Sequence, residues 1–315
     1  MIDASLRGVT IPLSVIVPTR DTRDLTLACL ASVARSEGSG AFELILVDDG
    51  GRDGTAEAAA GAHPGIRTIV REEPGGFTVA ANAGLRAAGG EVLLLLNSDA
   101  QVEPDAPARL LAAFSADPRL GAAGAELVDP DGAPQWSAGR RPSSLWLFAL
   151  ASGLPRALGR LPGYRRVKRP GVRGVAVDWV SGAALAIRRA AWVDAGPLDE
   201  RFAFYCQDLE YGERLRRRGW RVALVEGARV RHRGGATIGR RGIPLLWADL
   251  VRWSALANGP RGARSAARAF AIGGRLRLAA RSLAAPWIAE SRRAAFREET
   301  DGYREALAAV RGWAR

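Results

Sequence analysis

Residues 92–99 read VLLLLNSD, an apolar run that stops at an amide, a hydroxyl and a carboxylate. Five apolar residues, preceded by AAGGE and followed by a polar turn, are typical of a short strand that is buried on both faces. The run is too short to cross a membrane. The sequence therefore predicts that Asp99 stands where a buried strand meets solvent.

Three similar apolar segments precede this one, and helical patterns lie between them. The segments are LSVIV (13–17), FELILV (42–47) and IRTIV (66–70). Strands that alternate with helices predict an α/β fold with a mostly parallel twisted sheet and helices on both faces. Ligands bind such sheets beyond the carboxyl ends of the strands. Polar or glycine-rich segments occupy those ends: PTR (18–20), DDGG (48–51), REEPGG (71–76) and NSDA (97–100).

After Leu120 the regular alternation ends. A strand runs into a turn at 129–132, and residues 134–174 are rich in Pro, Gly, Arg and Trp with little periodicity. Further along we predict a strand at 175–180 that leads into SGAALAIRRAAW, a helix over 208–218 that Gly219 ends, and two strand-like pieces. Residues 244–315 read as a basic helical extension, because arginines alternate there with Leu, Ala and Trp.

Composition narrows the class of protein. The 315 residues carry a net charge of +12 and are 48% hydrophobic, but no segment has the length and apolar character of a membrane span. The N-terminus lacks the pattern of a signal peptide, so we expect a cytoplasmic protein in which Cys29 and Cys206 stay reduced. A positive surface attracts nucleic acid, phospholipid head groups or a diphosphate substrate. Because no nucleic-acid-binding motif is present, we predict no nucleic acid partner.

Several strand-end residues have two interpretations. Asp48 and Asp49 are placed to contact a ribose or base, or to cap the following helix. The glycines of PGGFT (74–78) leave amides for a phosphate at a helix start, although neither a dinucleotide fingerprint nor a Walker A sequence is present. Asn82, in that helix, is either a ligand contact or an ordinary surface amide.

Three later residues suggest a metal and a base. A divalent cation prefers oxygen ligands, and Asp99 alone suffices if substrate phosphates complete its shell. His232 also follows a strand-like segment, and imidazole suits Mn²⁺ and similar ions. Asp208 stands at a predicted helix start, as an N-cap or as a general base that takes a proton from an attacking hydroxyl.

The ordered set of motifs resembles family 2 glycosyltransferases, which have the GT-A fold, and in particular the rhamnosyl- and galactofuranosyltransferase-like branch. The resemblance runs from about Leu13 to Gly235 through VIVPTR, LVDDGGRDGT, GGFTVAANAGLRAAGGEVLLLLNSDA, VSGAALAIRRAAWVDAGPLDERFAFYCQDLEYGERLRRRGW and ARVRHRGG. It implies a GT-A domain over 1–243, with a donor-binding half at about 10–130 and an acceptor-side half at about 131–243, followed by the helical extension 244–315.

The resemblance also implies roles for the matched positions. Residues expected to bind the nucleotide sugar are Pro18, Thr19, Arg20, Asp48, Asp49, Asn82, Asn97, Ser98 and Asp99. Those expected on the acceptor side are Ser181, Gly182, Ala183 and Gln207. Asp99 and His232 would hold Mn²⁺ or Mg²⁺, and Asp208 would be the catalytic base. Asn97 and Gln207 depart from the family, since acidic residues are common at both positions.

The implied reaction is inverting transfer of a sugar from a dTDP-, UDP- or GDP-linked donor to a glycan or a polyprenyl-diphosphate-linked acceptor in cell-surface polysaccharide synthesis. The alternatives are a sugar nucleotidyltransferase and a non-catalytic sugar- or nucleic-acid-binding relative. The basic extension indicates contact with an anionic membrane, peripherally on the inner face of the plasma membrane, or packing on the catalytic domain.

Overall fold

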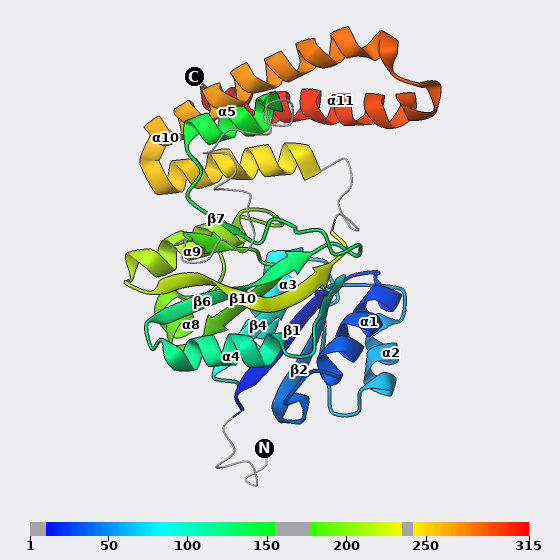
Figure 1. Ribbon diagram of the computed structural model, residues 1–315, viewed down its shortest axis with the longest axis vertical. Helices are drawn as coiled ribbons and strands as arrows, with labels where there is room; N and C mark the ends of the chain where they lie inside the picture. The colour runs from blue at the N-terminus through cyan, green and yellow to red at the C-terminus, as the bar shows by residue number, and fades with distance from the viewer. Residues whose placement is uncertain (1–10, 155–176, 235–241, 315) are drawn as a thin grey trace. The chain divides into compact units, whose positions relative to one another are not determined.

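The protein is described by a computed structural model over residues 11–154, 177–234 and 242–314. These residues form two compact units (Figure 1). The first contains 11–139, 177–203 and 207–234, and the second contains 140–154, 204–206 and 242–314.

An eight-stranded sheet forms the centre of the first unit. Its strands are β1 (Leu13–Thr19), β2 (Phe42–Asp48), β3 (Arg67–Val70), β4 (Val92–Leu96), β5 (Ala100–Val102), β6 (Leu120–Val128), β9 (Ala184–Arg188) and β10 (Arg221–His232). They lie in the order β3-β2-β1-β4-β9-β6-β10-β5. Strands β1 to β4 are parallel, whereas β9 is antiparallel to both its neighbours and β5 is antiparallel to β10. The predicted α/β sheet is therefore confirmed.

Helices cover both faces of this sheet (Figure 1). They are α1 (Arg23–Ala34), α2 (Thr55–Ala62), α3 (Phe77–Ala87), α4 (Ala106–Ala116), α8 (Arg189–Ala195) and α9 (Gln207–Arg217). One core cluster joins β4 residues Leu94 and Leu96 to α1, α2 and α4. The other joins Leu93 and Leu95 to α3, α8 and α9. Because successive side chains of a strand point to opposite faces, this sandwich explains why VLLLL is apolar at every position.

Two predicted strands differ in the structure. The predicted strand 175–180 is reduced to β8 (Trp179–Val180), which pairs with β7 (Ala138–Gly139), and residues 175–176 lie outside the described residues. The two pieces expected after Gly219 are one strand, β10, whose register shifts between Val225 and Arg229. Gly227, with φ of 79°, lies in this irregularity and allows the strand to continue past it.

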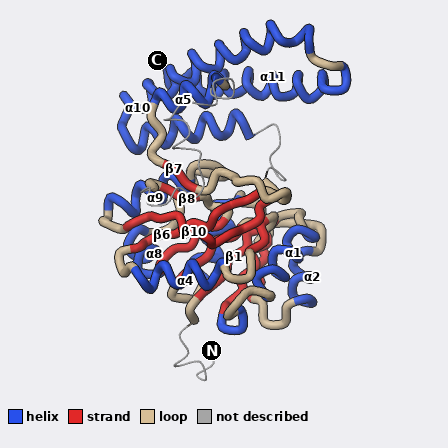
Figure 2. Tube along the Cα trace, viewed as in Figure 1, coloured by secondary structure: helices blue, strands red, loops and turns tan. Residues whose placement is uncertain are grey.

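The described part of the second unit is helical (Figure 2). It contains α5 (Ser144–Ser152), α10 (Gly242–Ala284, kinked at Gly259 and Pro260), the 3₁₀ turn η4 (Ala285–Trp287), α11 (Glu290–Val310) and the 3₁₀ turn η5 (Arg311–Ala314). The predicted helical extension is confirmed. Helix α5 was not predicted, because SLWLFALAS is apolar almost throughout and has no helical periodicity.

Helix α5 packs on α10 within this unit, so residues 140–152 do not join the predicted acceptor-side half 131–243. A Cβ at Gly273 would lie 2.7 Å from the carbonyl oxygen of Phe148, which shows how closely the two helices approach. Trp247 stacks on Phe270 with ring centroids 4.7 Å apart. None of the described helices combines the length and apolar character needed to cross a bilayer.

Candidate active site

The carboxyl ends of β1, β2 and β4 meet at one edge of the sheet, as the parallel order requires. The amide of Asp49 donates to the carbonyl of Thr19 at 2.9 Å, and the hydroxyl of Thr22 donates to that of Ser98 at 3.1 Å. The segments that follow β1, β2 and β4 are distant in sequence but lie together at the carboxyl edge of the sheet.

Asp99 and His232 are brought together there. His232 ends β10, which pairs with β5, and its Nε2 lies 3.3 Å from Oδ1 of Asp99. The amide of Gly234 donates to Oδ2 of the same carboxylate at 3.0 Å. Burial favours the neutral acid, but the His232 ring and the amide outweigh it, so the pKa of Asp99 lies below its ordinary value. Asp99 is therefore poised to carry a negative charge.

Gln135 determines which nitrogen of His232 carries hydrogen. Its Nε2 donates to the His232 carbonyl at 2.7 Å, so its Oε1 faces Nδ1 at 2.8 Å. An amide oxygen only accepts, so Nδ1 must be the protonated nitrogen. In the neutral ring the lone pair of Nε2 then points to the cluster, where Nδ2 of Asn97 lies 3.2 Å away.

These residues fit a divalent cation. A lone pair on Nε2 and the Asp99 carboxylate repel each other at 3.3 Å unless a proton or a cation stands between them. Oδ1 of Asn97 is buried and has no hydrogen-bond partner among the described residues. One carboxylate, one imidazole and an amide oxygen suit Mn²⁺ or Mg²⁺ only with further oxygens. The described part of the chain has no group of three or more His, Cys, Asp or Glu side chains that could hold a metal ion, so a bound diphosphate or water would have to complete the shell.

Asp208 lies in the first turn of α9 and is partly buried. Its Oδ2 accepts from the amide of Gly182 at 2.9 Å, and its Oδ1 accepts from its neighbour Leu209 at 2.8 Å. Burial raises the pKa of Asp208, and the two amide donors only partly offset this effect. A carboxylate with a raised pKa is a stronger base, which suits proton removal from a hydroxyl.

The segment Ser181–Ala183 connects this carboxylate to the cluster of Asn97, Asp99 and His232. The amide of Gly182 donates to Asp208. The carbonyl of the following residue, Ala183, accepts from the amide of Asn97 at 3.0 Å. A Cβ at Gly182 would lie 3.3 Å from Nε2 of Gln207, so a glycine leaves room for that side chain. Gln207 is 5% exposed, and its Oε1 is buried without a hydrogen-bond partner among the described residues. An acceptor group could satisfy this oxygen.

Backbone strain marks both sides of the site. Among the described residues, Asp21 (φ 52°) and Cys206 (φ 63°) are the non-glycine residues with positive φ. Asp21 follows the end of β1, and Cys206 comes two residues before Asp208. Such conformations are costly and cluster at functional sites.

The expected phosphate cradle at Gly75 and Gly76 is not available. Both amides donate to the carboxylate of Asp49, at 2.9 and 2.7 Å, and Nε of Arg71 binds the same group at 2.8 Å. Asp49 is 4% exposed and holds this loop, and its contact with a ribose or base stays a prediction. Asp48 accepts from the amide of Gly51 at 2.8 Å, and burial raises its pKa.

Asn82 is not a surface amide, and its contact with a ligand stays a prediction. Asn82 is fully buried, and its amide donates to the carbonyl of Leu198 and to Glu200 while its oxygen accepts from the amide of Leu198. With every polar group satisfied inside the protein, it anchors the loop that leads to α9.

The remaining predicted donor contacts differ in exposure. Pro18 is buried in β1, and the buried hydroxyl of Thr19 bonds those of Thr22 and Thr26. Arg20 is half exposed, and Ser98 is partly buried. Of these residues, Arg20 and Ser98 retain the accessibility that contact with a nucleotide requires.

Comparison with known proteins places the chain in a family. The model of glycosyl transferase family 2 matches residues 14–186, which include nearly all of β1, the Asn97–Asp99 turn and the Ser181–Ala183 segment. The chain belongs to glycosyl transferase family 2. The predicted resemblance is thus confirmed, and the chain is a glycosyltransferase.

Individual relatives agree with this assignment. This family 2 glycosyltransferase is 33% identical over 216 residues to the N-acetylglucosaminyl-diphospho-decaprenol L-rhamnosyltransferase of Mycobacterium tuberculosis, a match that covers 62% of the chain and 68% of that protein. It is 27% identical over 248 residues to the O-antigen biosynthesis protein RfbC of Myxococcus xanthus, which covers 76% of the chain and 18% of that protein.

The fold of this family 2 glycosyltransferase also has a solved counterpart. The mannosyltransferase PcManGT from Pyrobaculum calidifontis, in complex with GDP-Man and Mn²⁺, superimposes with a TM-score of 0.63 at 19% identity. The match covers 98% of the chain and 88% of that protein. The GT-A fold is therefore confirmed.

Sequence reasoning missed Gln135 in this family 2 glycosyltransferase. The residue lies in a segment without periodicity, and nothing nearby in sequence signals a partner for His232. Two residues later, the Ser137 carbonyl accepts from the amide of Ser181 at 2.8 Å, so one short segment supports both His232 and the acceptor-side residues.

Proposed function

We propose that this glycosyltransferase moves a sugar from a nucleoside diphosphate donor to an acceptor hydroxyl with inversion, and that it depends on a divalent metal. The observation that carries the proposal is the Gly182–Ala183 segment. It binds a partly buried carboxylate, Asp208, through the amide of Gly182 and the Asn97–Asp99 turn through the carbonyl of Ala183. The proposed base, Asp208, and the proposed metal-binding turn thus contact two consecutive residues, Gly182 and Ala183.

In the proposed reaction the acceptor oxygen attacks the anomeric carbon while Asp208 takes its proton. The bond between that carbon and the diphosphate oxygen breaks, and the nucleoside diphosphate leaves. Asp99 and His232, with the oxygen of Asn97, would hold Mn²⁺ or Mg²⁺, which neutralises charge on the diphosphate when it is bound. Gln207 supplies an unsatisfied oxygen for an acceptor hydroxyl.

The acceptor is proposed from the relatives. The Mycobacterium tuberculosis relative is named for an N-acetylglucosaminyl-diphospho-decaprenol acceptor and for rhamnose transfer. We therefore propose a polyprenyl-diphosphate-linked glycan as acceptor, a dTDP-, UDP- or GDP-linked sugar as donor, a role in cell-surface polysaccharide synthesis, and a peripheral location on the inner face of the plasma membrane. No structural observation favours the nucleotidyltransferase or the non-catalytic alternative.

The test compares Asp208→Asn with a matched control. Asp208→Asn should reduce turnover by at least about 100-fold, because general base catalysis typically contributes that much. It should still bind nucleoside diphosphate with Mn²⁺ in calorimetry. The control is Asp194→Asn, which changes an acidic residue on the outer side of α8 that binds Arg218 and Trp220. Unchanged turnover in Asp208→Asn, or an equal loss in the control, would refute the assignment.

A further inference from the structure

Helix α10 is unusual in charge after its first two turns. From Leu250 to Ala289 the chain contains seven arginines and no aspartate or glutamate. The segment forms most of α10 and the turn η4, and α11 packs beside it. Acidic residues are plentiful elsewhere, so this stretch concentrates positive charge on one element.

The same helix has two distinct faces. Ala263, Phe270 and Gly274 are buried on its inner face, where a Cβ at Gly274 would lie 2.8 Å from the Trp247 ring. Half a turn away the outer face is open to solvent. Its residues, which recur at helical spacing, are Arg268, Ile272, Arg275, Leu276, Leu283 and, in η4, Trp287.

The outer face exposes large apolar side chains to an unusual degree. Ile272 is 55% exposed, Leu276 49%, Leu283 78% and Trp287 87%. A row of such side chains marks an interaction surface, because each one leaves apolar area in contact with water. The exposed arginines among them, Arg268 and Arg275, favour a partner that also carries negative charge.

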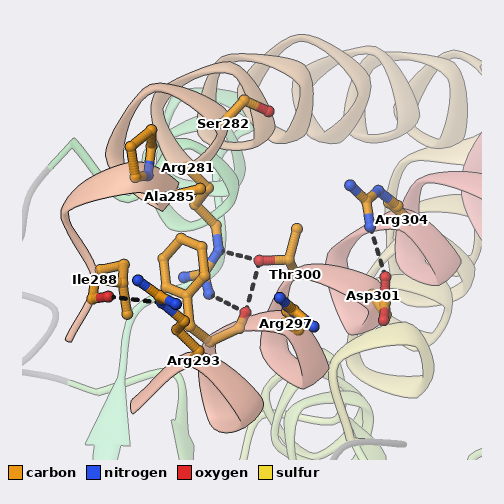
Figure 3. A pocket seen from close by; sticks show the side chains of 11 residues that line it. Arg281, Ser282, Ala285, Ile288, Arg293, Arg297, Thr300, Asp301 and Arg304 are labelled. Carbon is orange, nitrogen blue, oxygen red and sulfur yellow. Dashed lines mark hydrogen bonds and ion pairs between the residues drawn. The ribbon is translucent and has the colours of Figure 1, made fainter. Parts of the chain in front are cut away.

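A cavity at the end of this helix adds more positive charge. It has a volume of about 420 Å³ and lies between the ends of α10 and α11 (Figure 3). Four arginines and one acidic residue line it: Arg281, Arg293, Arg297, Arg304 and Asp301. Arg281 is held by Thr300 and Glu299, which fixes one wall. The cavity adjoins the exposed Trp287, because Pro286 and Ile288 also line it.

We propose that the outer face of α10 from Arg268 onward, together with η4, docks on an anionic phospholipid surface. Leu283 and Trp287 enter the boundary between head groups and acyl chains, while the arginines remain among lipid phosphates. A nucleic acid would match the charge but would offer no apolar layer for Leu283. The proposal extends the peripheral location included in the proposed function and depends on no step of the transfer reaction.

Vesicle flotation tests the docking face. Wild-type protein should bind mixed phosphatidylcholine and phosphatidylglycerol vesicles, bind phosphatidylcholine alone much more weakly, and release as salt rises. The double variant Leu283→Ser/Trp287→Ser should lose affinity for the mixed vesicles by about tenfold or more. Arg268→Gln/Arg275→Gln should lose the preference for anionic lipid. The control Val193→Ser, which removes a 74% exposed valine on α8, should bind as wild type does.

Quenching by brominated lipids locates the inserted residue. Trp287→Phe keeps an apolar side chain, so it should bind vesicles as wild type does but lose most of the lipid-dependent quenching. Sugar transfer to a water-soluble acceptor is measured for each variant as well. This measurement does not need a membrane, so it distinguishes a failure of docking from a failure of the proposed reaction. Absence of binding to anionic vesicles overturns the inference. A second result also overturns it: vesicle binding that is weakened by Arg268→Gln/Arg275→Gln but not by Leu283→Ser/Trp287→Ser. That result would indicate a surface for polyanions and not for lipid.

Discussion

Gln135 and His232 hold each other through two hydrogen bonds, one to the backbone carbonyl and one to the ring, across 97 residues of sequence. The pair orients Nε2 of the imidazole toward Asp99. Partners of this kind orient metal ligands in proteins, and their loss typically weakens metal affinity by about 10- to 100-fold.

Gln135→Leu should therefore release the His232 ring and weaken binding of Mn²⁺ alone by about 10- to 100-fold. Gln135→Glu keeps an acceptor for Nδ1 and should retain the Nδ1-protonated ring. Nitrogen NMR can read this tautomer directly, because the chain has two histidines and His63→Asn isolates His232. Paramagnetic resonance measures Mn²⁺ affinity. An unchanged tautomer together with unchanged affinity in Gln135→Leu would show that Gln135 does not position the ring.

The pH dependence of turnover should follow Asp208. Burial raises its pKa above the ordinary aspartate value of about 3.9, and the base must be ionised to accept a proton. We expect kcat at saturating donor, acceptor and Mn²⁺ to fall as pH decreases, with a midpoint above 3.9. A profile that stays flat below pH 3.9 in still-folded protein would contradict this role.

Asn82→Ala should lower the free energy of unfolding by about 3 kcal/mol, because it leaves both backbone groups of Leu198 unpaired in the core. Urea unfolding measures the loss. Gln101→Ala, at an exposed position of β5, is the matched control and should change stability by less than about 0.5 kcal/mol. If Asn82→Ala has the same free energy of unfolding as the control but binds nucleotide poorly, the result supports a contact between Asn82 and the nucleotide sugar.

Asp249 should make the free energy of unfolding fall as pH rises, whereas most carboxylates have the opposite effect. Burial raises its pKa to about 6, although Arg252 and the amide of Tyr205 oppose this shift. The folded state therefore holds the proton more tightly than the unfolded state, so stability falls as pH rises from about 4 to past 6.

Asp249→Asn removes that cost and should be more stable than wild type by about 2 kcal/mol above pH 6, with no advantage at pH 4. Thermal unfolding from pH 4 to 8 measures the difference. Asp301→Asn, at an exposed acidic residue of α11, serves as the control. A constant difference between wild type and Asp249→Asn at all pH values would contradict the assignment.

Local sequence determined the elements of the first unit. The run 92–96 is apolar at every position because β4 lies between two layers of helices, and that pattern identified the strand and its polar end. Motif order also identified the family and singled out Asp99, Asp208 and His232. Helix α5 escaped prediction because SLWLFALAS carries apolar residues on its exposed side as well, such as Leu145, so its sequence lacks helical periodicity.

Only the tertiary structure decided which polar side chains remain available. Asp49 and Asn82 were predicted as ligand contacts, but segments far away in sequence saturate their hydrogen bonds: Gly75 and Gly76 for one, Leu198 and Glu200 for the other. Gln135 gained its role because β10 pairs with β5, which follows the Asn97–Asp99 turn, and with β6, whose Leu127 carbonyl accepts from the Gln135 amide. A residue's type states which bonds it can form, whereas the fold determines which partners come within reach.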